Sequence, residues 1–277
     1  MEKRRNEGAD RLKPEEAASS PDSDLQKVLR DLAGSLFEIL GSRLESIILY
    51  GSAVFDDLAP GYGDLDFVAV VDGNLSRTDC TKLRSLRRVL RDGKHPVYAE
   101  MLEGAFLPRA MLDPAVTGSA FWWGTTGERP WKRNELGPVA LYVIRARGRA
   151  VFGRDVRAEI PAPDREALFG EIRQFCETAR AFSRETTLHT VDWLLMAARF
   201  LVFVREERLT SKSEAADWAV RNAQGDWRFF LPKARDVRLN PSQADGADVK
   251  EWLTSLAGPI NDACAELERA MSGQGAA

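Results

Sequence analysis

Apolar residues follow two different patterns along this chain. Residues 44–50 and 65–71 are apolar runs of strand length, and over 25–40 apolar residues recur at helical spacing. From residue 164 onward the spacing is helical almost throughout. We therefore predict an α+β fold, in which an N-terminal domain with a mixed β-sheet flanked by helices is followed by a C-terminal all-α helical bundle.

Cap and turn residues set the limits of these elements. Ser23 predicts a helix N-cap, Gly51-Ser52 ends the first strand, and the Gly- and Pro-rich stretch 57–63 predicts a loop. A long connection without clear periodicity is expected at 108–134. The further predicted elements are strands at 97–106 and 150–152 and helices at 76–91, 135–147, 166–183, 187–207, 211–222, 227–238 and 247–271.

A linker with two prolines, at 153–163, separates two predicted domains. We predict a tail at 1–23, an N-terminal domain at 24–157, a helical bundle domain at 158–273 and a short tail at 274–277. Roughly the first twenty residues are charged and are expected to be disordered.

Two aspartates one residue apart mark the second strand. Side chains alternate along a strand, so Asp64 and Asp66 leave the same face and their carboxylates lie close together. Adjacent carboxylates repel each other unless a cation lies between them, and oxygen ligands suit Mg2+. The pair predicts a magnesium site, although an Asp-x-Asp pattern alone is often only a solvated strand end.

A Gly-Ser turn precedes this pair. At Gly51 the backbone N–H groups can approach a phosphate closely, and Ser52 adds a small hydroxyl. A Gly-Ser pair alone is a common turn. The order of strand, Gly-Ser, 11 residues, Asp-x-Asp and second strand is more specific, and we interpret it as a metal-dependent nucleotidyl-transfer site.

With these residues the chain resembles the nucleotidyltransferase superfamily, which carries Gly-Ser, a similar spacer and Asp-x-Asp on the next strand. Within it the chain resembles the aminoglycoside adenylyltransferases of the streptomycin/spectinomycin type, through GSAV at 51–54, DLDFVAVV at 64–71 and LTSKSEAADWAV at 209–220. The resemblance covers most of residues 25–269 and is poor over 107–136. The chain differs from these enzymes in a spacer that is one residue longer and that ends in glycine where serine is common.

A third carboxylate is expected on the strand next to Asp64 and Asp66. Glu100 and Glu103 both lie in the predicted strand 97–106 and, being three residues apart, face opposite sides. The resemblance implies a glutamate on this strand that acts as general base, and the match of VYAEMLEGAF assigns it to Glu100. The alternative for Glu100 is a solvated glutamate at a strand edge. We interpret Glu103 as a residue near a turn.

The resemblance also implies that two basic residues of the helical part bind the ATP phosphates. These are Arg199, in the apolar helix WLLMAARFLVFV, and Lys212, at a predicted helix start where anions bind favourably. An unpaired guanidinium in such a helix is costly, so Arg199 requires either an internal carboxylate or a phosphate. For Lys212 the alternative is an ordinary lysine without a binding role.

The acceptor implied by the resemblance is a polycation, which acidic and aromatic side chains bind. Candidates are Trp122 or Trp123 of the long connection, and His189 and Asp192 on one predicted helix. A packing role for the aromatic residues and a structural role for His189 are the alternatives. His189 stands where the drug-modifying enzymes carry an acidic specificity residue.

Composition limits the classes of partner. The 39 basic and 42 acidic residues give a net charge of −3, so no basic surplus indicates nucleic acid, which argues against polymerases and RNA-tailing enzymes. Cys80, Cys176 and Cys264 lack metal-ligand spacing and are expected to be free thiols. No apolar run has the length of a membrane span, and we expect a cytoplasmic monomer.

These observations predict an ATP-dependent adenylyltransferase. It is expected to use Mg2+ and to transfer AMP from ATP to a hydroxyl of a small cationic acceptor, an aminoglycoside or aminocyclitol antibiotic. The alternative is a nucleotide-binding regulator or an antitoxin-like nucleotidyltransferase that acts on a protein partner. The intact carboxylates argue against a regulator without catalysis, and the second, helical domain argues against the small antitoxin type.

Overall fold

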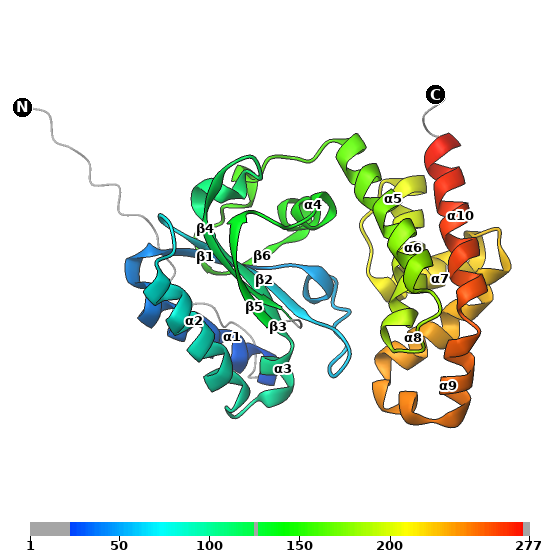
Figure 1. The fold of residues 1–277 in the computed structure, drawn as a ribbon, viewed down its shortest axis with the longest axis horizontal. Coiled ribbons are helices and arrows are strands. Elements are labelled where there is room, and N and C mark those ends of the chain that lie inside the picture. The colour runs from blue at the N-terminus through cyan, green and yellow to red at the C-terminus, as the bar shows by residue number, and fades with distance from the viewer. Residues whose placement is uncertain (1–22, 125–126, 274–277) are drawn as a thin grey trace, which may run out of the picture. The chain divides into compact units, whose positions relative to one another are not determined.

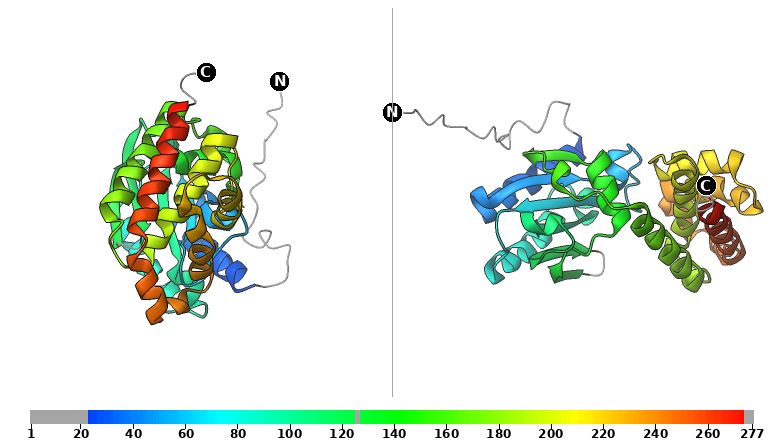
Figure 2. Two further views of the ribbon diagram at one scale, coloured as in Figure 1. Left: turned by 90° about the vertical axis from the view of Figure 1, so that its right-hand side faces the viewer. Right: turned by 90° about the horizontal axis from the view of Figure 1, so that it is seen from above.

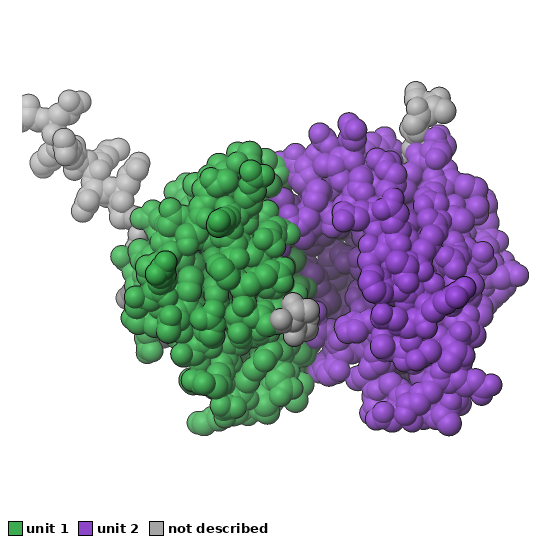
Figure 3. All heavy atoms as spheres, in the orientation of Figure 1, with its two compact units in different colours: residues 1–50, 65–135, 144–161 green, residues 51–64, 136–143, 162–277 purple. Residues whose placement is uncertain are grey.

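The computed structural model describes residues 23–124 and 127–273, so the predicted tails lie almost wholly outside the described residues. The chain forms two compact units, coloured separately in Figure 3. Unit 1 contains residues up to 50, 65–135 and 144–161, and unit 2 contains 51–64, 136–143 and 162 to the C-terminal end. Unit 1 holds the sheet and unit 2 the helical bundle (Figure 1), which confirms the predicted α+β class.

Unit 1 is built on a six-stranded mixed sheet with the strand order β5-β4-β3-β2-β1-β6. Among the described strands only β2 and β3 pair in parallel, and the other neighbours are antiparallel. The strands are β1 (Leu44–Leu49), β2 (Leu65–Val71), β3 (Leu102–Pro108), β4 (Thr117–Gly124), β5 (Gly127–Arg133) and β6 (Arg149–Gly153).

Two helices, α1 (Asp24–Leu40) and α2 (Arg77–Arg91), cover one face of this sheet (Figure 1). The Ser23 side chain caps α1 as predicted, accepting a hydrogen bond from the N–H of Gln26. Phe37 of α1 packs on Phe152 of β6, with ring centroids 6.1 Å apart. The apolar residues that recur at helical spacing in α1 therefore form the face that packs against the sheet.

Aromatic side chains fill the centre of that face. Phe67, Phe106 and Trp123 meet edge to face at centroid distances of 5.5, 5.8 and 4.7 Å. Gly104 makes this packing possible, because a Cβ there would lie 2.5 Å from the carbonyl oxygen of Phe67. Trp123 is fully buried, and its size makes it a major contributor to the core.

The predicted strand at 97–106 is wrong in its first half. Residues Pro96–Glu100 form a short helix, α3, and β3 begins only at Leu102. Proline suits the first turn of a helix, since its missing N–H has no partner there anyway, and the N–H of Ala99 bonds to the carbonyl of His95.

The long connection predicted at 108–134 is also wrong, because it contains the β4–β5 hairpin. The alternation of its residues is obscured by Gly118, Gly124 and Gly127, and by a break in register between Thr117 and Ala120. A strand signal of period two is easily hidden by such interruptions.

Unit 2 is a helical bundle in which α6 packs on α5, α7, α8 and α10, and α5 and α10 lie beside α6 (Figure 2). Its helices are the first half of α4 (Pro138–Arg147), α5 (Arg165–Phe182), α6 (His189–Glu206), α7 (Lys212–Asn222), α8 (Leu231–Leu239), α9 (Ala247–Thr254) and α10 (Ala257–Gly273). The single helix predicted at 247–271 is two helices, α9 and α10, with Pro259 in the first turn of the second. None of the described helices has the length and apolar character needed to cross a bilayer.

A buried carboxylate ties the C-terminal helix to the bundle. Glu266 of α10 is 1% exposed and accepts hydrogen bonds from Arg205 Nη2 (2.8 Å), Trp227 Nε1 (2.8 Å) and the N–H groups of Gln224 (2.9 Å) and Gly225 (3.1 Å). Burial raises the pKa of Glu266, but these hydrogen bonds outweigh it and hold the pKa below its usual value.

Replacing this carboxylate is expected to destabilise the protein strongly. Glu266→Gln leaves the buried Arg205 contact without its counter-charge and should lower the free energy of unfolding by about 3–5 kcal/mol, measured by urea denaturation. Glu268→Gln is the matched control, because Glu268 pairs with Arg180 at the surface of the same helix, and exposed pairs contribute less than about 1 kcal/mol.

The difference between wild type and Glu266→Gln should also depend on pH. A lowered pKa means that the carboxylate contributes its full stabilisation above its usual pKa of 4.5, and that the contribution is lost as the pH falls through the lowered value. Equal effects of the two substitutions, or a difference that grows in acid, would contradict this account.

Candidate functional site

The Gly-Ser turn follows β1 directly. Gly51 has a φ of 64°, a conformation that favours glycine, and Gly51–Val54 form one turn of 3-10 helix. The hydroxyl of Ser52 donates a hydrogen bond of 3.4 Å to the carbonyl of Asp64. The turn is thus joined to the residue that opens the Asp-x-Asp pair, although 12 positions separate them in sequence.

Parallel pairing brings a third carboxylate beside this pair. In the β2–β3 register Asp66 lies opposite Glu103, and Leu65 opposite Leu102. Neighbouring strands are about 4.8 Å apart, so the side chains of Asp66 and Glu103 leave the same face of the sheet as neighbours. Asp64 immediately precedes β2, two residues before Asp66.

Glu100 does not occupy that place. It is the last residue of α3, is exposed, and lies outside the sheet. The premise that Glu100 stands on the strand beside Asp66 is therefore wrong, and Glu103 takes that position.

A signal for this was present in the sequence. Each of the two strands begins with leucine followed by an acidic residue, Leu65-Asp66 in LDFVAVV and Leu102-Glu103 in LEGAFLP. Two parallel strands that start alike place their second residues side by side. Gly104, which follows Glu103, suggests a turn in the sequence but is instead the site of close packing by Phe67.

The donor set fits a magnesium ion. Mg2+ is usually held by one or two carboxylates together with waters and substrate phosphates, and Asp66 of β2 and Asp64 just before the strand supply two carboxylates close together in the chain. Among residues 23–124 and 127–273, no cluster of three or more His, Cys, Asp or Glu side chains is arranged to hold a metal by itself. A metal at these two carboxylates would therefore need further ligands, such as waters and a bound phosphate.

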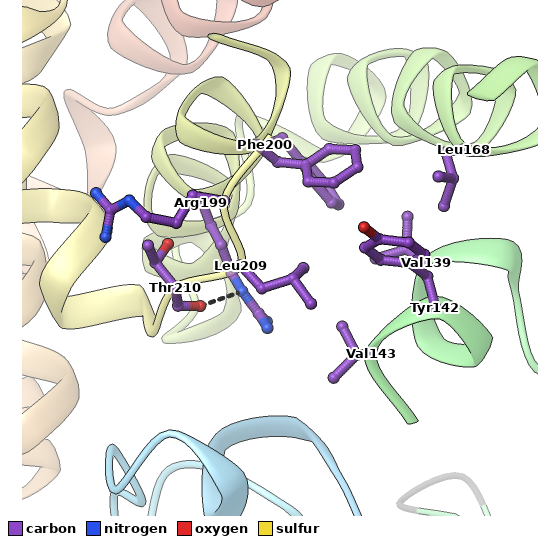
Figure 4. Close-up of a pocket in the computed structure, with 10 residues that line it drawn as sticks. Val139, Tyr142, Val143, Leu168, Arg199, Phe200, Leu209 and Thr210 are labelled. Carbon is purple, nitrogen blue, oxygen red and sulfur yellow. Dashed lines mark hydrogen bonds between the residues drawn. The ribbon is translucent and has the colours of Figure 1, made fainter. Parts of the chain in front are cut away.

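Arg199 lies on α6 in unit 2. Its Nε donates to the carbonyl of Thr210 at 2.8 Å, as drawn in Figure 4, and its guanidinium lies 4.9 Å from the centroid of the Phe55 ring. Phe55 belongs to the segment that follows Ser52. The arginine predicted to bind phosphate is therefore in contact with the loop that carries the predicted phosphate turn.

A small apolar cavity adjoins this arginine. Tyr142, Leu168, Phe200 and Leu209 line it (Figure 4), and its volume is about 20 Å³. A cavity of this size holds about one water molecule. It is therefore a packing gap and not a pocket for a nucleotide base.

Lys212 begins α7, and its Nζ lies 2.7 Å from Asp192 Oδ1 on α6. The anion position at this helix N-terminus is already filled, because Ser213 N–H bonds to Asp57 Oδ2 and Glu214 N–H to Ser211 Oγ. The N-terminal N–H groups of α7 thus bind the protein's own oxygens, whereas the lysine side chain is held by a carboxylate.

The four residues proposed for the acceptor differ in their surroundings. Trp123 is a core residue, whereas Trp122 is half-buried and stacks on Trp131 with centroids 4.8 Å apart. Trp122 pairs with Ala105, two residues beyond Glu103, so it lies on the same face of the sheet as Glu103. His189 is exposed at the first position of α6, and Asp192 pairs with Lys212.

Comparisons with known proteins support the resemblance drawn from the sequence. Residues 159–262 match the family model described as aminoglycoside adenylyltransferase, C-terminal domain, whereas no curated protein matches the chain. Among solved structures, the fold is similar to spectinomycin adenyltransferase AAD(9) from Enterococcus faecialis, with a TM-score of 0.67, 15% sequence identity and coverage of 87% of this chain and 98% of that one. That structure contains ATP and spectinomycin. The C-terminal half of the chain thus matches the family model that the sequence resemblance predicts, and the chain shares its fold with this adenyltransferase.

Proposed function

We propose that this protein transfers AMP from Mg-ATP to a hydroxyl group of a small cationic acceptor of the aminoglycoside or aminocyclitol class. The observation that carries the proposal is the placement of Glu103 beside Asp66 on parallel strands, with Asp64 two positions before. Three carboxylates in this order supply what nucleotidyl transfer requires, a metal site and a base. The similarity to an adenyltransferase solved with ATP and spectinomycin supports the substrate classes.

Glu103 is the proposed general base. It accepts the proton of the acceptor hydroxyl as that oxygen bonds to the α-phosphorus of ATP, while the bond from that phosphorus to the departing pyrophosphate breaks. Asp64 and Asp66 would hold Mg2+, which when bound neutralises the phosphate oxygens. Because Glu103 leaves the sheet beside Asp66, the base stands next to the carboxylates that orient the phosphate.

Three residues of unit 2 are proposed to hold the phosphates: Ser52, Arg199 and Lys212. The positively charged pair attracts the triphosphate, and the Ser52 hydroxyl adds a short-range hydrogen bond. In this arrangement Asp192 fixes Lys212 at 2.7 Å, so Asp192 serves the lysine and not a cationic acceptor. The acceptor contact is assigned to Trp122, whose ring lies on the face that carries Glu103.

A pyrophosphate-release assay tests the function. Wild-type protein with ATP and Mg2+ should release pyrophosphate when one member of a panel of aminoglycosides, spectinomycin and small aminocyclitols is added. Asp64→Asn with Asp66→Asn should abolish release, because the metal ligands are lost. Binding of Mg-ATP without release for any acceptor would favour a regulator that acts on a protein partner, and release by the double variant would refute the metal site.

Matched glutamine variants test the base. Glu103→Gln keeps size and hydrogen bonding but cannot accept the proton, so kcat should fall by about 10²–10⁴-fold while ATP still binds, measured by calorimetry. Glu100→Gln is the control and should retain activity, since Glu100 is exposed at the end of α3. A large loss in Glu100→Gln with an active Glu103→Gln would reverse the assignment.

Two tryptophan variants test the acceptor contact. Trp122→Ala removes the exposed part of the stacked pair and should raise the KM for the acceptor by roughly tenfold, equivalent to about 1.4 kcal/mol of cation–π contact, with the KM for ATP unchanged. Trp123→Ala should instead lower the free energy of unfolding by about 3–5 kcal/mol, because this side chain is fully buried. An unchanged acceptor KM in Trp122→Ala would remove the residue from the acceptor site.

A further inference from the structure

Asp57 links the segment after the Gly-Ser turn to two helices of the bundle. Its Oδ1 accepts hydrogen bonds from Ser213 Oγ (2.6 Å) and Arg238 Nη1 (3.1 Å), and its Oδ2 from Ser213 N–H (3.1 Å). Arg238 Nη2 also donates to the carbonyl oxygen of Asp57. Ser213 belongs to the first turn of α7 and Arg238 to α8, so one residue of the loop is held by both helices.

The charges of this contact are buried. Arg238 is 1% and Asp57 9% exposed. Removing two opposite charges from water is costly, and their attraction offsets that cost only when geometry and hydrogen bonding are nearly complete. A surface loop without a functional constraint could be attached at lower cost by apolar side chains. Because a buried ion pair costs more free energy than apolar packing, its use here indicates that the loop must be placed accurately.

The same loop is attached at two further points on either side of Asp57. Phe55 lies under the guanidinium of Arg199, and the Tyr62 hydroxyl donates to the carbonyl of Leu188 at 2.9 Å. Between them Asp56 has a φ of 52°, which is uncommon for a residue other than glycine and persists where the surroundings hold the backbone. The loop between Ser52 and Asp64 is thus held by the bundle at Phe55, Asp57 and Tyr62.

The attachment also joins the residues assigned to the phosphates. Asp57 N–H bonds to the carbonyl of Ser52 at 3.2 Å, and Ser213, which binds the Asp57 carboxylate, directly follows Lys212. The path from the Ser52 turn to the Lys212 helix therefore runs through one carboxylate, and Phe55 connects the same loop to Arg199.

We propose that Asp57 and Arg238 form a positioning pair, which holds the Gly-Ser turn in register with Arg199 and Lys212 so that all three act on one triphosphate. This inference rests on the proposed use of ATP. Neither residue touches the nucleotide in this account. Their effect is to fix beforehand the spacing of groups that bind it, which spares the protein the entropy of ordering the loop on binding.

A positioning role and a purely structural role predict different kinetics. If the pair only stabilises the bundle, its removal lowers the melting temperature and the fraction of active protein, which lowers apparent kcat and leaves the KM for ATP unchanged. If it positions the turn, Asp57→Asn raises the KM for ATP by about tenfold or more, which corresponds to about 1.4 kcal/mol, and kcat at saturating ATP stays close to wild type.

The experiment measures ATP KM, kcat and melting temperature for Asp57→Asn, Arg238→Gln and the double variant, with Glu266→Gln as control. Glu266 is a comparably buried carboxylate paired with an arginine in the same bundle, and its hydrogen bonds go to Arg205, Trp227 and the backbone at 224–225, away from the loop segment 52–64 in sequence. The two single variants should raise the ATP KM similarly, and the double variant no further, because they break one contact. The control should lower the melting temperature at unchanged KM.

Hydrogen exchange of the ligand-free proteins separates this inference from the proposed function. In Asp57→Asn and not in Glu266→Gln, the amides of residues 51–64 should exchange faster than in wild type. If Asp57→Asn shows this faster exchange but wild type binds no Mg-ATP, the proposed function is overturned, and the nucleotide role of the pair with it. An unchanged ATP KM in Asp57→Asn, with wild type binding ATP normally, would overturn the positioning pair alone.

Discussion

β2 and β3 run in parallel, so both strands enter the sheet at the same edge and their second residues stand side by side. This backbone constraint brings the carboxylate of Glu103 next to that of Asp66, although 30 residues of chain, including α2 and α3, separate the two strands. An antiparallel pairing would set the start of one strand against the end of the other and would separate the two acids. The proposed metal site and base therefore depend on this one pairing.

The packing behind the strands protects that arrangement. Phe67, Phe106 and Trp123 fill the opposite face of the same strands, and the close approach of Phe67 to Gly104 leaves no room for a side chain there. A slip of one residue would exchange the two faces and bury the carboxylates among aromatic rings. The packing of the core thus fixes the register of the strands. The same register sets the positions of the acidic side chains on the opposite face.

In unit 2 the corresponding role belongs to buried carboxylates. Glu266 and Asp57 each accept hydrogen bonds from an arginine and from backbone N–H, two residues' N–H groups for Glu266 of the C-terminal helix and one for Asp57 of the loop after the Gly-Ser turn. Interactions of this kind contribute little net stability compared with apolar packing, but they are highly directional. They are well suited to fixing the position of a loop that carries binding groups, because apolar contacts allow a wider range of orientations.

Local patterns predicted much of this protein. The Ser23 cap and the helical spacing that follows gave α1, the apolar runs gave β1 and β2, and the periodicity after residue 164 gave the bundle. Where the pattern was interrupted, prediction failed: the glycines of the β4–β5 hairpin hid a period of two, and the apolar run beginning at Val97 concealed a helical turn started by Pro96. In both cases the segment is short, and its secondary structure is determined by the residues that it packs against.

The sequence by itself indicated the proposed chemical class, because Gly-Ser and Asp-x-Asp are local motifs that are recognised from their spacing along one chain. Only the tertiary structure decided which glutamate accompanies the aspartates, which tryptophan is in the core, and which carboxylate holds Lys212. These choices depend on strand register and helix packing between residues far apart in the chain, and a local pattern such as the shared Leu-acid start of the two strands gains its meaning only once their parallel pairing is known. Proximity in space, not in sequence, selects the residues that can act together.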